Sequence, residues 1–129
     1  MCGITGFFKT EDTDLQLAES IIMSMTDSLI HRGPDDSNIL IDSDSNVVFG
    51  HRRLSILDTS KGGLQPMLSK SENLVIVFNG EIYNHFDLRA QIEYENKTIA
   101  WKSTSDTETL LAAFEHWGIE ETLPRIRGM

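Results

Sequence analysis

The first hydrophobic pattern is a short alternation at the start of the chain. Residues 2–8 place small and apolar side chains in turn, with Gly3 and Gly6 between them. Such a segment is typical of a buried strand that other backbone approaches closely. Capping-box spacing begins at Thr13, and apolar residues then recur at helical intervals. We therefore expect a strand over residues 2–8 and a helix over residues 14–30.

Two short apolar runs follow, and a polar turn separates them. Residues 39–41 and 47–49 are apolar with only polar residues between them, which predicts a β-hairpin. Residues 58–73 are rich in Ser, Gly, Lys and Asp, which predicts a loop. The apolar run 74–78 predicts a second buried strand, which ends before the turn-forming residue Asn79.

Helical patterns return in the last third of the chain. One helix is expected over residues 85–92, and a second after Ser105, because Ser105 and Glu108 have capping-box spacing. The apolar stripe of the second helix consists of Leu110, Leu111, Phe114 and Trp117. Strands and helices are thus both predicted in a chain of 129 residues, which is the length of a single domain.

Composition and charge exclude several classes of protein. Hydrophobic residues make up 40% and charged residues 24% of the chain, which is typical of a globular protein. The net charge of −9 disfavours binding to nucleic acid or to an anionic membrane. The longest apolar run, 74–78, is far shorter than the roughly 20 residues of a membrane-spanning helix. No secretory signal is visible, so we expect a cytoplasmic protein.

The single cysteine, Cys2, is the strongest candidate for chemistry. It follows Met1, and an initiator methionine before a small side chain is commonly removed. Removal would leave a thiol and a free α-amine on one residue, and an N-terminal amine can act as the base for such a nucleophile. On position alone, an inert small side chain at the start of a strand is the more usual interpretation of Cys2.

Other polar positions could bind a substrate, although each also has a structural interpretation. The Asn79 amide and the Gly80 N–H could donate to an oxyanion, but this pair is also common in turns. Arg53 could bind a carboxylate through two hydrogen bonds or form a surface ion pair. Asp106 begins a predicted helix, where the helix dipole already favours an acid. The four histidines show no metal-ligand spacing, so no metal is expected.

Six ordered motifs carry a resemblance to one family. They are MCGITG (1–6), HRGPD (31–35), GHRRLSILD (50–58), QPM (65–67), FNGEIYN (78–84) and SDTE (105–108). Together they resemble the glutaminase domain of glutamine-hydrolysing asparagine synthetases, which are class II glutamine amidotransferases. The motifs span nearly the whole chain, so the resemblance is specific.

The resemblance implies an α+β fold, the αββα sandwich of N-terminal-nucleophile hydrolases, with two antiparallel sheets between helical layers. It implies that residues 1–129 form the N-terminal part of a type 2 glutamine amidotransferase domain. The family continues beyond the Gly-Met that ends this sequence, so we expect an incomplete sandwich and a synthetase domain outside these residues. ATP and magnesium would belong to that domain, and no cofactor is expected in this chain.

The resemblance also implies a reaction. Cys2 would attack the side-chain amide of glutamine with its own α-amine as base, while Asn79 and Gly80 form the oxyanion hole. A γ-glutamyl thioester would form, ammonia would leave, and water would release glutamate. The ammonia would support ATP-dependent synthesis of asparagine from aspartate in the synthetase domain.

Substrate-binding residues follow from the same resemblance. Arg53 would bind the α-carboxylate of glutamine, and Asp106 and Glu81 would bind its α-ammonium. The oxyanion-hole residues would also contact the substrate. The backbone that completes the pocket would be that of Leu54, Ser55, Ile56 and Leu57.

Several alternatives stay open. The chain could be a non-catalytic binding module, for instance if Met1 is retained and blocks the amine. It could serve another amidotransferase with a different ammonia acceptor. A hydrolase for an unrelated amide is disfavoured, because Arg53 and Asp106 suit an α-amino acid. The expected partners are L-glutamine and the synthetase domain, without nucleic acid or membrane, and a homodimer is left open.

Overall fold

The computed structural model describes residues 2–55 and 60–129, and the chain divides into two compact units. The N-terminal unit consists of Met1–Ser55, Leu64–Pro66 and Val77–Asn79. The C-terminal unit consists of Ile56–Gly63, Met67–Ile76 and Gly80–Met129. Segments distant in sequence therefore contribute to each unit.

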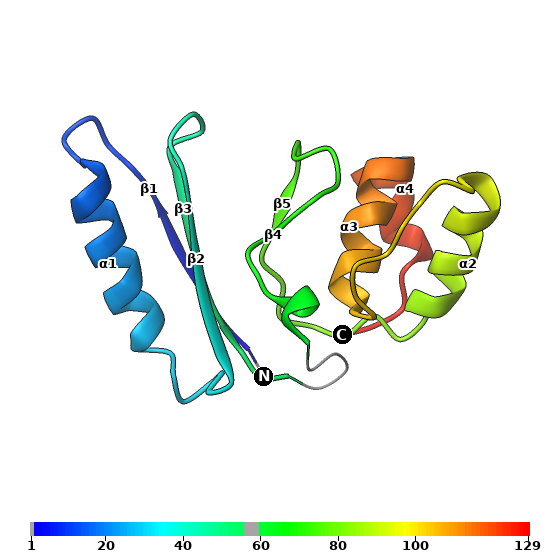
Figure 1. Cartoon of the computed structure of the whole chain (residues 1–129), viewed down its shortest axis with the longest axis horizontal. Helices are drawn as coiled ribbons and strands as arrows, with labels where there is room; N and C mark the ends of the chain where they lie inside the picture. Colours follow the sequence, from blue (N-terminus) through cyan, green and yellow to red (C-terminus); the bar gives the residue numbers. More distant parts are fainter. Residues whose placement is uncertain (1, 56–59) are drawn as a thin grey trace. The chain divides into compact units, whose positions relative to one another are not determined.

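A three-stranded antiparallel sheet forms the framework of the N-terminal unit, in the order β1-β3-β2 (Figure 1). The strands are β1 (Gly3–Phe8), β2 (Asp36–Asp42) and β3 (Val47–Arg53). The predicted hairpin is confirmed as β2 and β3, and both strands extend beyond the apolar runs. The extension has a physical reason, because β3 is the central strand and its backbone pairs with neighbours on both sides.

The strand β1 differs from the expectation of a buried strand. It lies at the edge of the sheet, where it pairs with β3 on one side. Its side chains alternate between the two faces, so Phe8 is 78% exposed and Ile4 is also exposed. The apolar alternation identified a strand correctly but could not show which strands neighbour it.

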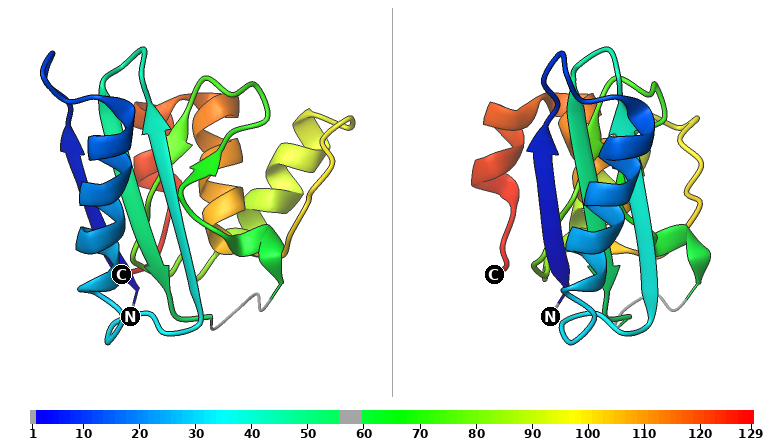
Figure 2. Two further views of the ribbon diagram at one scale, coloured as in Figure 1. Left: turned by 60° about the vertical axis from the view of Figure 1, so that its left-hand side comes forward. Right: turned by 90° about the vertical axis from the view of Figure 1, so that its left-hand side faces the viewer.

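The helix α1 (Leu15–Asp27) covers one face of this sheet (Figure 2). The core between them consists of fully buried Ala18, Ile22 and Val48. Close approach depends on Gly50, because a Cβ at that position would lie 2.1 Å from Thr26 Oγ1. The helix thus approaches β3 closely at Gly50, which carries no side chain.

The ends of α1 differ from the predicted range of 14–30. The N-cap is Asp14, whose Oδ1 accepts from the Leu17 N–H at 2.8 Å, while the Thr13 hydroxyl pairs with Thr10. Beyond Asp27 the N–H groups of Leu29, Ile30 and Arg32 each donate to the carbonyl three residues earlier, as from Ile30 N–H to the Asp27 carbonyl. The chain therefore tightens into turns before the predicted end of the helix.

The C-terminal unit is mainly helical. It contains α2 (His85–Glu95), α3 (Asp106–Trp117) and α4 (Ile119–Thr122), with the 3₁₀ segments η1 (Lys61–Gly63) and η2 (Leu123–Arg125). The helices α2 and α3 pack together. The buried apolar side chains are Ile82, Leu88, Ile92, Leu110, Leu111 and Ala113. Both predicted helices are confirmed, and α2 continues three residues past its expected end at residue 92.

The predicted cap of α3 is confirmed in part. Ser105 is the N-cap, and its hydroxyl accepts from the Glu108 N–H at 3.1 Å. The reciprocal bond of a capping box is replaced, because the Ser105 N–H donates to Ser103 Oγ at 3.2 Å. Glu108 instead accepts from the backbone N–H groups of Lys102 and Ser103, each at 2.8 Å. The carboxylate thus binds the segment before the helix.

The loop expected over residues 58–73 and the strand expected over 74–78 were predicted less well. Residues 58 and 59 lie outside the described part of the chain, and the rest of the expected loop contains η1 and the strand β4 (Met67–Leu68). The expected strand over 74–78 is only β5 (Val75–Ile76), which is half-buried and pairs with β4. Beyond it, the Phe78 N–H donates to Gln65 Oε1 rather than to a strand.

The predicted fold class is confirmed. The described residues form two antiparallel sheets together with helices, which is the α+β arrangement expected of an N-terminal-nucleophile hydrolase. None of the helices in residues 2–55 and 60–129 is long and apolar enough to cross a membrane.

Candidate functional site

The predicted nucleophile lies against the segment predicted to complete the substrate pocket. The Leu54 N–H donates to Cys2 Sγ at 3.4 Å, and the sulfur lies 3.8 Å from the Leu54 carbonyl oxygen. The register of the sheet explains this contact, because Gly3 of β1 pairs with Arg52 of β3. Cys2 precedes β1 by one residue, and Leu54 follows β3 by one residue. The half-buried thiol is therefore placed by backbone pairing.

Arg53 is the last residue of β3 and is only 5% exposed. Its Nη1 lies 3.3 Å from Oδ2 of Asp36, the residue opposite it in the register of β2 and β3. The neighbouring Arg52 donates to the Gly33 carbonyl at 3.0 Å and lies 3.7 Å from Asp27 of α1. Because side chains alternate along a strand, Arg53 points to the face that α1 does not cover.

The loop that follows α1 supports the end of β3. Asp35 N–H donates to the Arg53 carbonyl at 3.0 Å, and Asp35 Oδ2 accepts from the Ser55 N–H at 2.8 Å. This contact joins the HRGPD motif to the LS part of the GHRRLSILD motif. The remaining predicted pocket residues, Ile56 and Leu57, lie outside the described part of the chain.

Asn79 belongs to the N-terminal unit and directly follows Phe78. Gln65 is buried, and its Oε1 accepts from the Phe78 N–H at 2.5 Å. His51 is also buried, and burial lowers its pKa, while the Phe78 backbone opposes this shift and the Arg53 charge adds to it. The side chains of Gln65 and His51 thus both interact with the backbone of Phe78, the residue before Asn79. The oxyanion role of Asn79 and Gly80 stays a prediction.

The two predicted acids lie in the C-terminal unit. Asp106 is the first residue of α3 and only 6% exposed, and its Oδ2 accepts from the Ile82 N–H at 2.8 Å. Burial raises the pKa of the Glu81 carboxyl, and the negative charge of Asp106 raises it further. Two neighbouring carboxylates repel each other, and a bound cation would relieve that repulsion. This pair is suited to an ammonium group.

The backbone around Glu81 is held by the last residues of the sequence. The Glu81 N–H donates to the Met129 carbonyl at 2.9 Å, and the Met129 N–H donates back at 3.0 Å. The approach at Gly128 needs a residue without a side chain, because a Cβ there would lie 2.0 Å from the Glu81 carbonyl oxygen. Glu81 is therefore fixed through its main chain.

Each unit assembles part of the predicted set of residues. Cys2, Arg53, Leu54 and Ser55 lie around the end of β3 in the N-terminal unit, whereas Glu81 and Asp106 meet at the start of α3 in the C-terminal unit. In the part of the chain that the structure describes, no group of three or more His, Cys, Asp or Glu side chains could hold a metal ion.

Sequence reasoning missed the residues that support these groups. His51 was considered only as one of four histidines without metal-ligand spacing, and Gln65 only as part of the QPM motif. Asp36 and Arg89 were given no role, although Asp36 pairs with Arg53 and Arg89 bonds the start of α3. The presence of a polar residue inside a motif is the sequence signal that could have identified His51 and Gln65. Arg89 has no such signal in the sequence.

Comparison with known proteins agrees with the motifs. The chain matches the glutamine amidotransferase domain family over residues 1–129. It is 42% identical over 131 residues to the glutamine-hydrolyzing asparagine synthetase 1 of Bacillus subtilis (strain 168), covering 100% of this chain and 20% of that protein. It is 36% identical to asparagine synthetase B of Escherichia coli (strain K12), covering 100% of this chain and 22% of that protein.

A plant relative is also matched over only about a fifth of its length. The chain is 32% identical over 120 residues to the glutamine-hydrolyzing asparagine synthetase 1 of Arabidopsis thaliana, covering 93% of this chain and 19% of that protein. The chain thus spans about a fifth of the length of these relatives. The family match covers every residue and all six motifs, with Cys2 and Arg53 in the N-terminal unit and Asp106 in the C-terminal unit. This chain belongs to the glutamine amidotransferase domain family.

Proposed function

We propose that this chain hydrolyses the side-chain amide of L-glutamine and supplies the ammonia to an asparagine synthetase. The observation that carries the proposal is the contact between Cys2 Sγ and the Leu54 backbone, 52 residues along the chain. It joins a thiol beside the N-terminus to the end of β3, where Arg53 is buried. The names of the relatives support glutamine as the ammonia source.

The proposed reaction begins with removal of Met1, which frees the α-amine of Cys2. That amine takes the thiol proton, and sulfur attacks the amide carbon of glutamine. The Asn79 amide and the Gly80 N–H stabilise the negative charge on the tetrahedral oxygen. The protonated amine then gives its proton to the leaving nitrogen, so that ammonia departs and a γ-glutamyl thioester remains. Water attacks the thioester, and glutamate and the free thiol are released.

The proposed binding of glutamine uses charges at both ends of its amino-acid group. Arg53 binds the α-carboxylate, and its guanidinium has five N–H donors, so it can hold Asp36 and a substrate carboxylate together. Glu81 and Asp106 bind the α-ammonium. The raised pKa of Glu81 supports this assignment, because a cation between the two carboxylates would favour their charged forms. The backbone of residues 54–57 completes the pocket.

The rest of the proposal concerns the whole protein. Ammonia is used by a synthetase domain that binds ATP and magnesium and converts aspartate to asparagine in the cytoplasm. The relatives, which are about five times as long as this chain, are named as asparagine synthetases. This chain itself supplies the thiol, the oxyanion hole and the binding charges, and we assign it no cofactor.

The test labels the full-length protein with an electrophilic glutamine analogue, followed by intact mass and peptide mapping. We expect one adduct, on Cys2, in protein that has lost Met1. Cys2→Ala should abolish glutamine hydrolysis yet keep synthesis from free ammonia. Cys2→Ser is the matched control, since it replaces the thiol with a hydroxyl at the same position. A label on another residue, or hydrolysis that survives in Cys2→Ala, would overturn the proposed function.

A further inference from the structure

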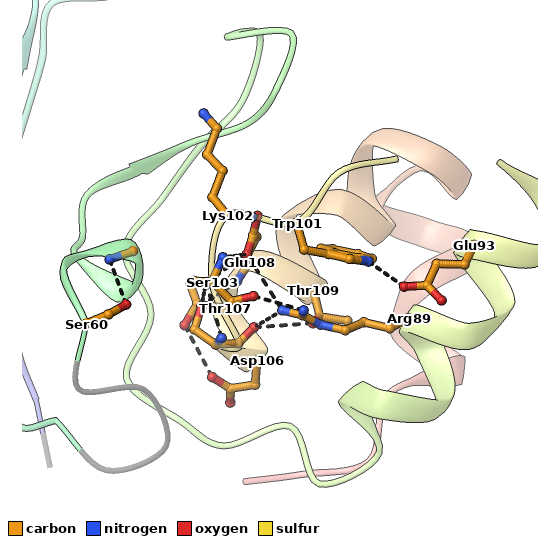
Figure 3. Close-up of polar contacts among 12 residues, drawn as sticks. Ser60, Arg89, Glu93, Trp101, Lys102, Ser103, Asp106, Thr107, Glu108 and Thr109 are labelled. Atoms are coloured by element: carbon orange, nitrogen blue, oxygen red, sulfur yellow. Dashed lines mark hydrogen bonds and ion pairs between the residues drawn. The ribbon is translucent and has the colours of Figure 1, made fainter. Parts of the chain in front are cut away.

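Arg89 makes a set of contacts that the proposed reaction does not use. It lies on α2 and is only 8% exposed, and its guanidinium reaches the start of α3 (Figure 3). Nε donates to Thr109 Oγ1 at 2.7 Å, Nη1 to the Ser103 carbonyl at 2.9 Å and Nη2 to the Ser105 carbonyl at 2.9 Å. One side chain therefore binds two carbonyls before α3 and a hydroxyl in its first turns.

Two further contacts fix the orientation of this guanidinium. The Arg89 Cζ lies 4.2 Å from the centroid of the Trp101 ring, and Nη2 lies 3.7 Å from Glu108 Oε2. Glu108 also accepts from the N–H groups of Lys102 and Ser103 (Figure 3). The segment before α3 is thus bound at its carbonyls by a cation and at its N–H groups by an anion. A buried charge is compensated by this pairing.

These bonds act on the residues next to Asp106. Ser105, whose carbonyl Arg89 binds, is the N-cap of α3 and precedes Asp106 directly. Asp106 in turn accepts from the Ile82 N–H, and its charge raises the pKa of neighbouring Glu81. A shift of the Ser103–Ser105 backbone would therefore move one carboxylate of the pair relative to the other.

We propose that Arg89 is a positioning residue for the ammonium-binding pair, which keeps Asp106 beside Glu81 by holding the backbone before α3. The inference rests on the proposed function, in which that pair binds the α-ammonium of glutamine. Arginine is required because its planar fork reaches three acceptors in separate directions. Lysine places all its donors on a single nitrogen and cannot reproduce this geometry.

The experiment compares two electrophilic analogues of glutamine in the full-length protein, one intact and one lacking the α-amine. The rate of Cys2 labelling is measured by intact mass for wild type, Arg89→Lys and Arg89→Gln. We expect both variants to react about tenfold or more slowly with the intact analogue, as for loss of a charged hydrogen bond. The analogue without the amine should react with all three proteins at the same rate. For glutamine, KM should rise while kcat changes little.

Arg125→Gln is the matched control. Arg125 also stacks on a tryptophan, with Cζ 4.7 Å from the Trp117 ring centroid, and its Nε donates to the Glu121 carbonyl at 3.0 Å. It lies in the same unit but is exposed and binds no residue before α3 through these contacts. In the Arg125→Gln variant, both analogues should label Cys2 at the wild-type rate.

Thr109→Val keeps the inference testable if the Arg89 variants do not fold. It nearly preserves side-chain volume and removes one acceptor of Arg89, together with the bond from the Thr109 hydroxyl to the Ser105 carbonyl at 3.3 Å. We expect the same selective loss, reduced to several-fold. Equal slowing of both analogues in this variant, or wild-type rates in Arg89→Lys, would overturn the positioning role. If wild-type protein does not distinguish the two analogues, the ammonium site of the proposed function fails instead.

Discussion

The two units hold their candidate residues by different means. In the N-terminal unit, strand pairing brings Cys2 to Leu54, and the thiol bonds to the Leu54 backbone there. In the C-terminal unit, Asp106 sits on a segment held by charged side chains from two helices. Backbone pairing tolerates changes of side chain, whereas a side-chain network depends on each member. Substitutions of residues that take no part in the reaction should therefore disturb the position of Asp106 in the C-terminal unit more than that of Cys2 in the N-terminal unit.

The largest effect on activity, after loss of Cys2, should come from Arg53→Lys. Hydrogen bonds to charged groups contribute about 1.5–3 kcal/mol, so kcat/KM for glutamine should fall about ten- to more than a hundredfold. Lysine keeps the charge but loses the fork that pairs with Asp36 and, in the proposed function, with the substrate carboxylate. Steady-state kinetics with glutamine and with an analogue lacking the α-carboxylate provide the measurement. Equal slowing of both substrates would show that Arg53 is a structural arginine.

A substitution in the core should separate stability from activity in the N-terminal unit. Gly50→Ala places a Cβ against Thr26 Oγ1 and Ile22. We therefore expect the free energy of the local unfolding that separates α1 from β3 to fall by about 1–3 kcal/mol. Native-state hydrogen exchange of β3 amides measures it. Gly118→Ala is the control: its Cβ would meet nothing within 4 Å, and only its φ of 83° is unfavourable. If Gly50→Ala left the hydrogen-exchange protection of the β3 amides unchanged, the packing of α1 against β3 would be contradicted.

Asp106→Asn should affect activity more than folding. The amide retains an oxygen that can accept from the Ile82 N–H, but the charge proposed to bind the ammonium is lost. We expect kcat/KM to fall about tenfold, with the domain's thermal unfolding displaced by a few degrees at most. Thr107→Ser, on the next residue of α3, is a control for local disturbance. A loss of stability that accounts for the lost activity would count against a role in binding.

The smallest effect should be a pH dependence of KM. Burial and the Asp106 charge raise the pKa of Glu81, so its carboxylate is lost at a higher pH than in an exposed glutamate. Affinity for the ammonium is therefore present above this raised pKa and falls as the pH drops through it. The charged form is disfavoured by folding, so Glu81→Gln should not destabilise the domain. We expect Glu81→Gln to raise KM several-fold and flatten its acidic pH dependence. An unchanged profile would remove Glu81 from the site.

Much of the fold follows from local chemistry. Ser105 caps α3 as its spacing predicts, because the bond from the Glu108 N–H to the hydroxyl spans only three residues. The hairpin β2–β3 follows from two apolar runs around a polar turn. The six motifs likewise name the family, since they are read directly from consecutive residues. Sequence alone therefore determined the family, the fold class and most of the helices.

Tertiary structure decided the features that depend on partners far along the chain. The strand expected over 74–78 shortens to Val75–Ile76 because the Phe78 N–H finds Gln65, 13 residues away. The edge position of β1 follows from pairing with β3, and the contact of Cys2 with Leu54 follows from that register. Arg89 reaches Ser105 only because α2 packs against α3. Periodicity and capping are local signals, so they identify an element and its start but cannot specify which distant group satisfies a buried donor or charge.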